Sequence, residues 1–175
     1  MIGSYSREPA RFRPYDPAAV QVAATVADAV RLLDPRLAVE HVGSTAVPGC
    51  AGKGVVDLAV LYPVDGLAVA VALLADLGFQ RQPGPDPFPE SRPMRVGSLV
   101  VAGRRYRIHA HVLASGCAEH LELVAFREAL RHRPDLCRAY EARKQAILAS
   151  GFTDSAQYAR EKSVFVRETL VVAGA

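Results

Sequence analysis

The sequence predicts a single α/β domain over residues 1–175, in which helices flank a mixed β-sheet and the C-terminal section is helical. Three observations indicate this class. Helical and extended apolar patterns alternate in the first half, a hairpin pattern follows, and the last third has helical spacing. Half of the residues are apolar, which is enough to build a buried core in a chain of this length.

The elements of the N-terminal half follow from helix signals and from the spacing of apolar residues. Asp16-Pro17 is typical of a helix start, because a carboxylate can cap free N–H groups and proline suits the first helical position. The helix is expected to end before Pro35. Residues 37–42 predict a short strand. Residues 55–62 are almost continuously apolar, as in a strand that is covered on both faces.

The later elements are predicted in the same way. Asp65 is expected to cap a helix over residues 67–77, which stops at Gly78. Prolines remove N–H donors and fix φ, so the proline-rich residues 82–93 are predicted to form a loop. The remaining predicted elements are a hairpin of strands 94–101 and 105–113 and three helices at about 118–132, 134–150 and 154–172.

Composition excludes several classes of protein. No apolar run approaches the roughly 20 residues that a membrane-spanning helix needs, and residues 1–7 have no signal-peptide pattern. The net charge of +3 is too small to indicate nucleic-acid binding. Cys50, Cys117 and Cys137 are far apart in the sequence and odd in number, which favours reduced thiols in the cytoplasm. Neither a disulfide framework nor a zinc site is expected from their spacing.

The first group of candidate functional residues is Gly43-Ser44-Thr45, directly after a predicted strand. Glycine allows a ligand to approach the backbone closely, and the two hydroxyl residues can offer O–H and N–H groups to a phosphate. The same pattern is typical of a capped helix start without a ligand, so both interpretations stay open. Gly52-Lys53 is not part of a Walker A loop, because the other residues of that motif are absent.

The second candidate is Asp57, a carboxylate inside an apolar strand. Burying a charge is costly unless an opposite charge or a metal ion accompanies it. Alternation places Asp57 and Ala59 on the same face of the strand, so the next residue on that face is not a second carboxylate. A metal ligand and a member of a structural ion pair are both consistent with this pattern.

The third group consists of Arg105, Arg107, His109 and His111, which alternate with apolar residues. We expect them to project from one face of a strand, with successive Cβ atoms about 7 Å apart. Two histidines at this spacing suit one metal ion, or one metal ligand and one general base. The alternative is a polar sheet face that is simply exposed to solvent.

A fourth pattern places Tyr140 with Lys144 and Tyr158 with Lys162, each pair one helical turn apart. Such a pair can stack on a nucleotide base and contact a phosphate. A tyrosine packed in the protein with a lysine lying along it is the alternative.

Together these motifs resemble the GrpB family of the nucleotidyltransferase-fold superfamily, over residues 8–170. The family's Glu-His-hydrophobic-Gly-Ser-Thr-small-hydrophobic-Pro-Gly motif is matched by residues 40–49, and its His-Leu-His-Val motif by residues 109–112. Three further segments match in the same order, at residues 52–58, 126–131 and 158–165. The sequence departs from the family pattern at Gly54, where proline is usual, and at Ala110, where leucine is usual.

The resemblance implies a nucleotidyltransferase-like fold and metal-dependent transfer of a nucleoside monophosphate from an NTP to a small-molecule or protein acceptor. Asp57 would bind a divalent ion, Mg²⁺ or Mn²⁺, and His109 or His111 would take the place of the second superfamily carboxylate, where Ala59 stands. The residues expected to contact the nucleotide are Gly43, Ser44, Thr45, Lys53, Arg107, Tyr140, Lys144, Tyr158 and Lys162.

A second hypothesis is a catalytically inactive module that binds a nucleotide or another phosphate ligand and assists a partner protein. Domains that resemble this one occur fused to dephospho-CoA kinase, which is consistent with such a role. A third hypothesis is a metal-dependent hydrolase that uses the same histidines. None of the three predicts a membrane partner or specific nucleic-acid binding.

Overall fold

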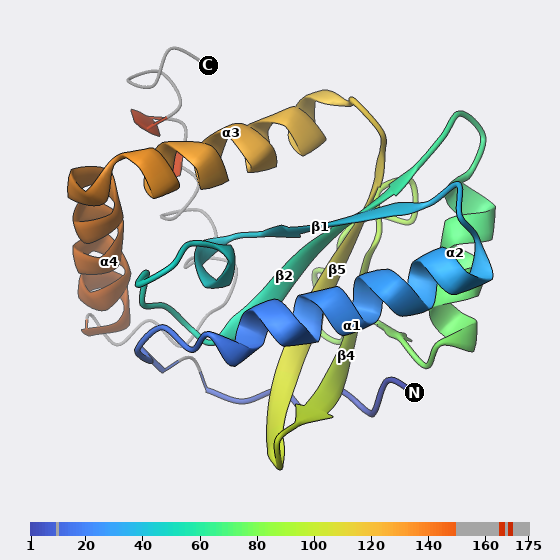
Figure 1. Ribbon diagram of the computed structural model, residues 1–175, viewed down its shortest axis with the longest axis horizontal. Helices are drawn as coiled ribbons and strands as arrows, with labels where there is room; N and C mark the ends of the chain where they lie inside the picture. Colours follow the sequence, from blue (N-terminus) through green and yellow to red (C-terminus); the bar gives the residue numbers. More distant parts are fainter. Residues whose placement is uncertain (10, 150–164, 167, 170–175) are drawn as a thin grey trace.

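The computed structural model describes residues 1–9, 11–149, 165–166 and 168–169. In chain order the elements are α1 (Ala18–Leu33), β1 (Ala38–Val42), the 3₁₀ turn η1 (Ser44–Ala46), β2 (Val55–Tyr62), α2 (Leu67–Asp76), β3 (Gln80–Arg81), β4 (Met94–Val101), β5 (Arg104–Ala114), α3 (Ala118–His132) and α4 (Pro134–Ala149). The expected α/β class, with helices flanking a mixed sheet, is confirmed (Figure 1).

The sheet has five strands in the order β1-β2-β5-β4-β3. β2 and β5 run parallel at its centre, and the other neighbouring strands pair antiparallel. The β4–β5 hairpin turns at Ala102 and Gly103, both with positive φ, which is the backbone that a tight two-residue hairpin requires.

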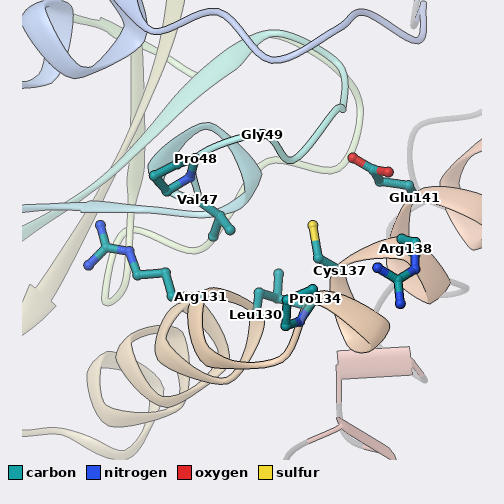
Figure 2. Close-up of a pocket in the computed structure, with 9 residues that line it drawn as sticks. All are labelled: Val47, Pro48, Gly49, Leu130, Arg131, Pro134, Cys137, Arg138 and Glu141. Carbon is teal, nitrogen blue, oxygen red and sulfur yellow. The ribbon is translucent and has the colours of Figure 1, made fainter.

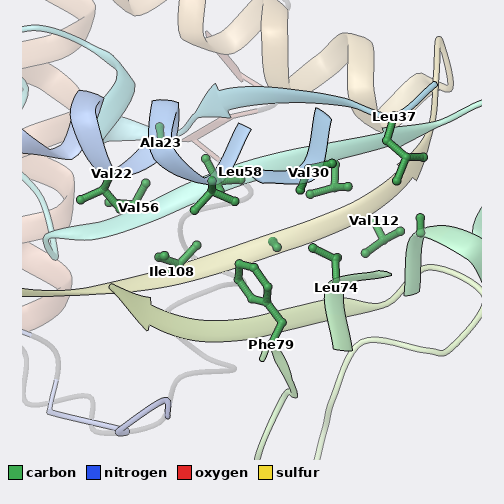
Figure 3. Packing of buried hydrophobic residues seen from close by; sticks show 14 of the residues in the cluster. Val22, Ala23, Val30, Leu37, Val56, Leu58, Leu74, Phe79, Ile108 and Val112 are labelled. Carbon is green, nitrogen blue, oxygen red and sulfur yellow. The ribbon is translucent and has the colours of Figure 1, made fainter. Parts of the chain in front are cut away.

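One face of the sheet is apolar and is covered by α1 and α2. Val22, Val26 and Val30 recur every fourth residue of α1 and are almost fully buried, so they form the stripe that packs on the strands. Figure 3 shows this cluster, in which residues of α1, Leu74 of α2 and Phe79 face the side chains of Val56, Leu58, Ile108 and Val112.

The opposite face is divided between a small apolar cluster and a polar region. The apolar cluster consists of Val42, Ala59, Leu61 and Leu113, with Leu123 of α3 packed against it. A third cluster joins α3 and α4 to the turn after β1, through Val47, Cys50, Phe126, Leu130 and Tyr140. The C-terminal helices therefore cover only part of this face, and the polar residues predicted from the sequence occupy the rest.

Most of the predicted elements agree with the structure to within a residue or two. Asp16 precedes the first turn of α1, and its Oδ1 accepts a hydrogen bond from the Ala18 N–H at 3.1 Å, as expected. The predicted cap at Asp65 is wrong: Asp65 has φ 61°, Gly66 precedes the first turn of α2, and no described side chain caps that end. β3 was not predicted, because its two residues are exposed and carry no apolar pattern.

The predicted helix at 154–172 lies mostly outside the described residues, but Phe165, Val166, Glu168 and Thr169 are helical. Within the described part of the chain, none of the helices has the length and apolar character needed to cross a bilayer.

Candidate functional site

The parallel register of β2 and β5 places Asp57 directly opposite His109, and Ala59 opposite His111. Because partners in a ladder share a face, the Asp57 and His109 side chains lie together on the polar face. His109 Nδ1 is 3.6 Å from Asp57 Oδ1, and the two side chains are 24% and 22% exposed. The structure therefore brings together one carboxylate and one imidazole, still reachable by a small ligand.

Tyr5 lies on the far side of the His109 ring. Its hydroxyl is 2.9 Å from His109 Nε2, and the two rings are 5.6 Å apart. Burial raises the pKa of Tyr5, so the hydroxyl keeps its proton at neutral pH. Gly3 pairs with Ser98 of β4 through two backbone hydrogen bonds, which holds this N-terminal segment on the edge of the sheet.

Arg107 completes this polar group from two residues earlier on β5. The guanidinium is buried; its Nη1 donates to the Glu8 carbonyl at 3.4 Å, and it also hydrogen-bonds to Tyr5. Because Arg107 can only donate, Tyr5 accepts from it and donates its own proton to His109 Nε2. The N–H of the His109 ring then lies at Nδ1 and faces Asp57.

Gly43 closes over the Asp57 carboxylate. It has φ 71°, and a Cβ atom at this position would lie only 2.7 Å from Asp57 Oδ2. Both the backbone conformation and the close approach require glycine here. The first residue of the predicted phosphate motif is therefore in direct contact with the predicted metal ligand.

The side chains of Ser44 and Thr45, the next two residues, point in different directions, and each has its own neighbours. Thr45 is buried, and its hydroxyl donates to the Val55 carbonyl at 3.2 Å and contacts His41 Nε2 at 3.0 Å. Burial lowers the pKa of His41 to about 4, so its ring is neutral and donates to Thr45. Ser44 faces Gly52 instead, where a Cβ atom would lie 2.5 Å from Ser44 Oγ. Thr45 thus fixes the turn against β2. It does not cap η1, whose N-terminal end has no side-chain cap among the described residues, so the capped helix start of the alternative interpretation is not found.

The Tyr140–Lys144 pair differs from the base-stacking surface expected at these positions. Both residues are 2% exposed. The Tyr140 ring stacks on Phe165 at 5.4 Å and meets the edge of Phe126, while Lys144 Nζ lies 4.0 Å above it. The spacing correctly places both on one helical face, but that face packs inside the protein. The predicted nucleotide contacts at Tyr158 and Lys162 lie outside the described residues.

The two other predicted site residues, His111 and Lys53, have different surroundings. The proline-rich loop carries Phe88 onto His111, with the ring centroids 5.4 Å apart and the planes at 82°. Arg92 in turn lies 5.2 Å above the Phe88 ring. Lys53 is partly exposed in the loop that precedes β2. The second histidine is therefore covered by an aromatic side chain that the sequence did not indicate.

Several family-motif residues tie α3 to the strand and turn that precede the site. Glu40 accepts hydrogen bonds from His120 Nε2 and from Arg127 Nη1, each at 3.1 Å. Arg127 also donates to the His41 carbonyl at 3.0 Å, and Arg131 donates twice to the Ala46 carbonyl. These partly buried, charge-assisted bonds hold the Gly-Ser turn in place.

A pocket of about 470 Å³ opens on the other side of that turn, between η1 and the α3–α4 junction (Figure 2). It is lined by Val47, Pro48, Gly49, Leu130, Arg131, Pro134, Cys137, Arg138 and Glu141. Sequence spacing gave no indication of it, because its walls come from segments about eighty residues apart. It is separate from the Asp57–His109 group.

Comparison with known proteins identifies the family. The model of the GrpB protein family matches residues 9–171. A UPF0157 protein of Pseudomonas aeruginosa is 36% identical over 90% of this chain, and the match spans 64% of that relative's length. A UPF0157 protein of Vibrio cholerae is 31% identical over 81% of this chain and 70% of its own length.

One solved structure agrees with this result. The crystal structure of the conserved protein GrpB from Enterococcus faecalis superposes with a TM-score of 0.69 and 25% identity, over 93% of this chain and 96% of that one. The poly(U) polymerase Cid1 aligns with a TM-score of only 0.42 and 12% identity, which is too distant to support an argument about this chain. From the family model and the relatives together, the chain belongs to the GrpB family.

Proposed function

We propose that this chain is a metal-dependent nucleotidyltransferase. In this function it moves a nucleoside monophosphate from a nucleoside triphosphate to an unidentified small-molecule or protein acceptor. The observation that supports it most directly is the pair of ligand atoms, Asp57 Oδ1 and His109 Nδ1, 3.6 Å apart on the polar face of the two central strands.

The donor set fits a divalent ion. One ion that binds an oxygen and a nitrogen at about 2.1 Å each holds the two ligand atoms roughly 3.0–3.5 Å apart, close to the separation found here. A carboxylate with an imidazole favours Mn²⁺ over Mg²⁺, because Mg²⁺ prefers oxygen ligands alone. Metal binding through Nδ1 requires the other tautomer of His109, in which Nε2 carries the proton and donates it to Tyr5; this hydrogen bond gives the metal ligand a fixed orientation.

The group transfer itself follows from the chemistry of NTPs. An acceptor hydroxyl or amine attacks the α-phosphorus, the bond to the departing pyrophosphate breaks, and the acceptor proton passes to a base, for which His111 is our candidate. A divalent ion supplies charge neutralisation to the attacked and leaving oxygens. Because residue 43 is glycine, the backbone can lie close to the Asp57 carboxylate. Lys53, which precedes Asp57 by one short loop and is partly exposed, is our candidate for the cation that attracts the phosphates.

A second candidate, the inactive binding module, is favoured by the surroundings of Ala59. This residue is fully buried in the apolar cluster with Val42, Leu61 and Leu113, so the position of a second carboxylate is filled by packing. A site with one carboxylate binds a metal–nucleotide complex more readily than it clamps both reacting oxygens.

The experiment is calorimetric titration of ATP, GTP, CTP and UTP with Mg²⁺ and with Mn²⁺. Asp57→Ala is compared with Asp28→Ala, a matched variant of an exposed carboxylate on α1. The proposal expects binding that needs the metal, disappears in Asp57→Ala and persists in Asp28→Ala. Binding of no nucleotide, or binding that Asp57→Ala leaves intact, would overturn it.

Product analysis then separates the candidate activities. Pyrophosphate together with a nucleotidylated acceptor supports transfer, whereas free nucleoside monophosphate without an adduct indicates hydrolysis. Binding without any product supports the inactive module.

A further inference from the structure

The joint between α4 and the loop after η1 holds a cluster of ligand-type side chains that the cysteine spacing did not predict. Cys50, Cys137 and Glu141 each place one sulfur or carboxylate oxygen within 4.8 Å of the others. Cys137 and Glu141 are four residues apart on α4 and therefore share one helical face. Figure 2 shows the Cys137 sulfur and the Glu141 carboxylate both directed from α4 toward the loop that follows Gly49.

We propose that Cys50, Cys137 and Glu141 form a zinc site that joins α4 to the Gly-Ser turn. Tetrahedral zinc has Zn–S distances of about 2.3 Å and Zn–O distances of about 2.0–2.2 Å, which places its ligand atoms roughly 3.5–3.8 Å apart. A movement of about 1 Å closes the cluster to that geometry. Two thiolates with one carboxylate are a donor set that selects zinc over the oxygen-seeking Mg²⁺.

The groups around the cluster orient two of its ligands. The Ala51 N–H donates to Glu141 Oε1, which fixes the carboxylate against the loop. Lys144 Nζ donates to the Ala51 carbonyl and lies 3.9 Å from Cys50 Sγ. Burial raises the pKa of Cys50 to about 12, and the charge of Lys144 offsets that rise only in part, so metal binding must displace the thiol proton. Such outer contacts are typical of metal sites, in which they hold the ligands in position.

The charges of the joint also balance when zinc is bound. With metal, the ion displaces two thiol protons, so its two positive charges are matched by two thiolates. Binding therefore adds no net charge to a buried region, which removes the largest energetic objection to a cation beside Lys144.

Three protein ligands leave the fourth position of a tetrahedral ion open. Cys137 and Glu141 line the pocket of about 470 Å³, whereas Cys50 is buried and does not line it. A water molecule or a small ligand can thus reach the ion from the pocket. The site is distinct from Asp57 and His109, and it does not depend on the proposed transferase activity.

The test uses the reduced, chelator-treated full chain and Co²⁺ as a spectroscopic substitute for Zn²⁺. We expect one equivalent of Co²⁺ to give thiolate-to-cobalt charge-transfer absorption and tetrahedral visible bands, which Zn²⁺ then displaces. Cys50→Ser and Cys137→Ser should each weaken binding by more than the roughly 10–100-fold that loss of an outer contact costs. Cys117→Ser is the matched control, because Cys117 packs in a different cluster, and it should bind like the wild type.

A second measurement needs no variant and so avoids any folding defect. Zn²⁺ should protect Cys137 from alkylation in the wild-type chain, while Cys117, also partly exposed, should react at the same rate with and without Zn²⁺. Absence of charge-transfer absorption, unchanged alkylation of Cys137, or a Cys50–Cys137 disulfide that forms without any metal uptake would each overturn the proposal. The Asp57→Ala variant should retain the absorption. Loss of the absorption in this variant would mean that Co²⁺ binds at Asp57 and not at the cysteines, which would also overturn the proposal.

Discussion

The two faces of the central sheet differ in how much of their structure the local sequence determines. On the face under α1 and α2, alternate residues of β2 and β5 are apolar and mostly buried, and the two covering helices come just before β1 and just after β2. On the other face, Tyr5 contacts His109, Phe88 contacts His111, and Leu123 of α3 packs on the small apolar cluster, and these three residues come from distant segments. The first face is specified by periodicity, while the second depends on tertiary contacts.

The largest expected effect lies on the apolar face. Ile108 is fully buried in the main cluster, and Ile108→Ala should lower the free energy of unfolding by about 2–5 kcal/mol, because it removes buried methyl groups and leaves a cavity. Urea denaturation measures this. The control, Leu121→Ala, changes a residue that is 57% exposed and should shift stability by less than about 0.5 kcal/mol. Equal effects from the two variants would contradict the assignment of this core.

The next effect concerns His41 on the edge strand β1, where it pairs with Leu58. Its pKa is about 4 when folded and about 6.5 when unfolded, so between these values the unfolded chain binds the extra proton. Stability should be complete above about pH 6.5 and fall by up to about 3 kcal/mol as the pH approaches 4. Denaturation at several pH values measures this loss, and His41→Gln should reduce it. An unchanged pH dependence in that variant would show that another group is responsible.

A smaller effect is expected at Gly43, where the backbone touches Asp57. Gly43→Ala should cost about 1–3 kcal/mol for the positive φ and should also displace the carboxylate. Gly49→Ala is a matched control, because Gly49 has φ 79° but a Cβ atom there meets nothing within 4 Å. Both variants should be destabilised, but only Gly43→Ala should weaken Mn²⁺-dependent nucleotide binding. Equal weakening in both would argue against a ligand at Asp57.

The smallest effect concerns the hydroxyl of Tyr5. Tyr5→Phe removes the hydrogen bond to His109 Nε2 and should lower the free energy of unfolding by about 0.5–1.5 kcal/mol. The ¹⁵N chemical shifts of the His109 ring report the tautomer directly, and they should change in this variant. Unchanged shifts would mean that Tyr5 does not set the proton position.

Sequence reasoning predicted the elements well because their apolar periods are local. It also placed Asp57 and His109 on polar faces of two strands, and only the parallel register was needed to bring them together. It failed where contacts are long-range. The helical spacing of Tyr140 and Lys144 gives a shared face but not whether that face is buried, and Cys50 meets Cys137 despite their separation along the chain.

The parallel pairing of β2 with β5 has a consequence for how the chain folds. These strands are separated in sequence by α2, β3 and β4, so closing the ladder between them costs more loop entropy than forming a hairpin or a helix. Asp57 and His109 become neighbours only when this slow, non-local step is complete. If the pair binds a metal ion, the rate of metal uptake during refolding would therefore report when β2 pairs with β5, a step expected after the helices have formed.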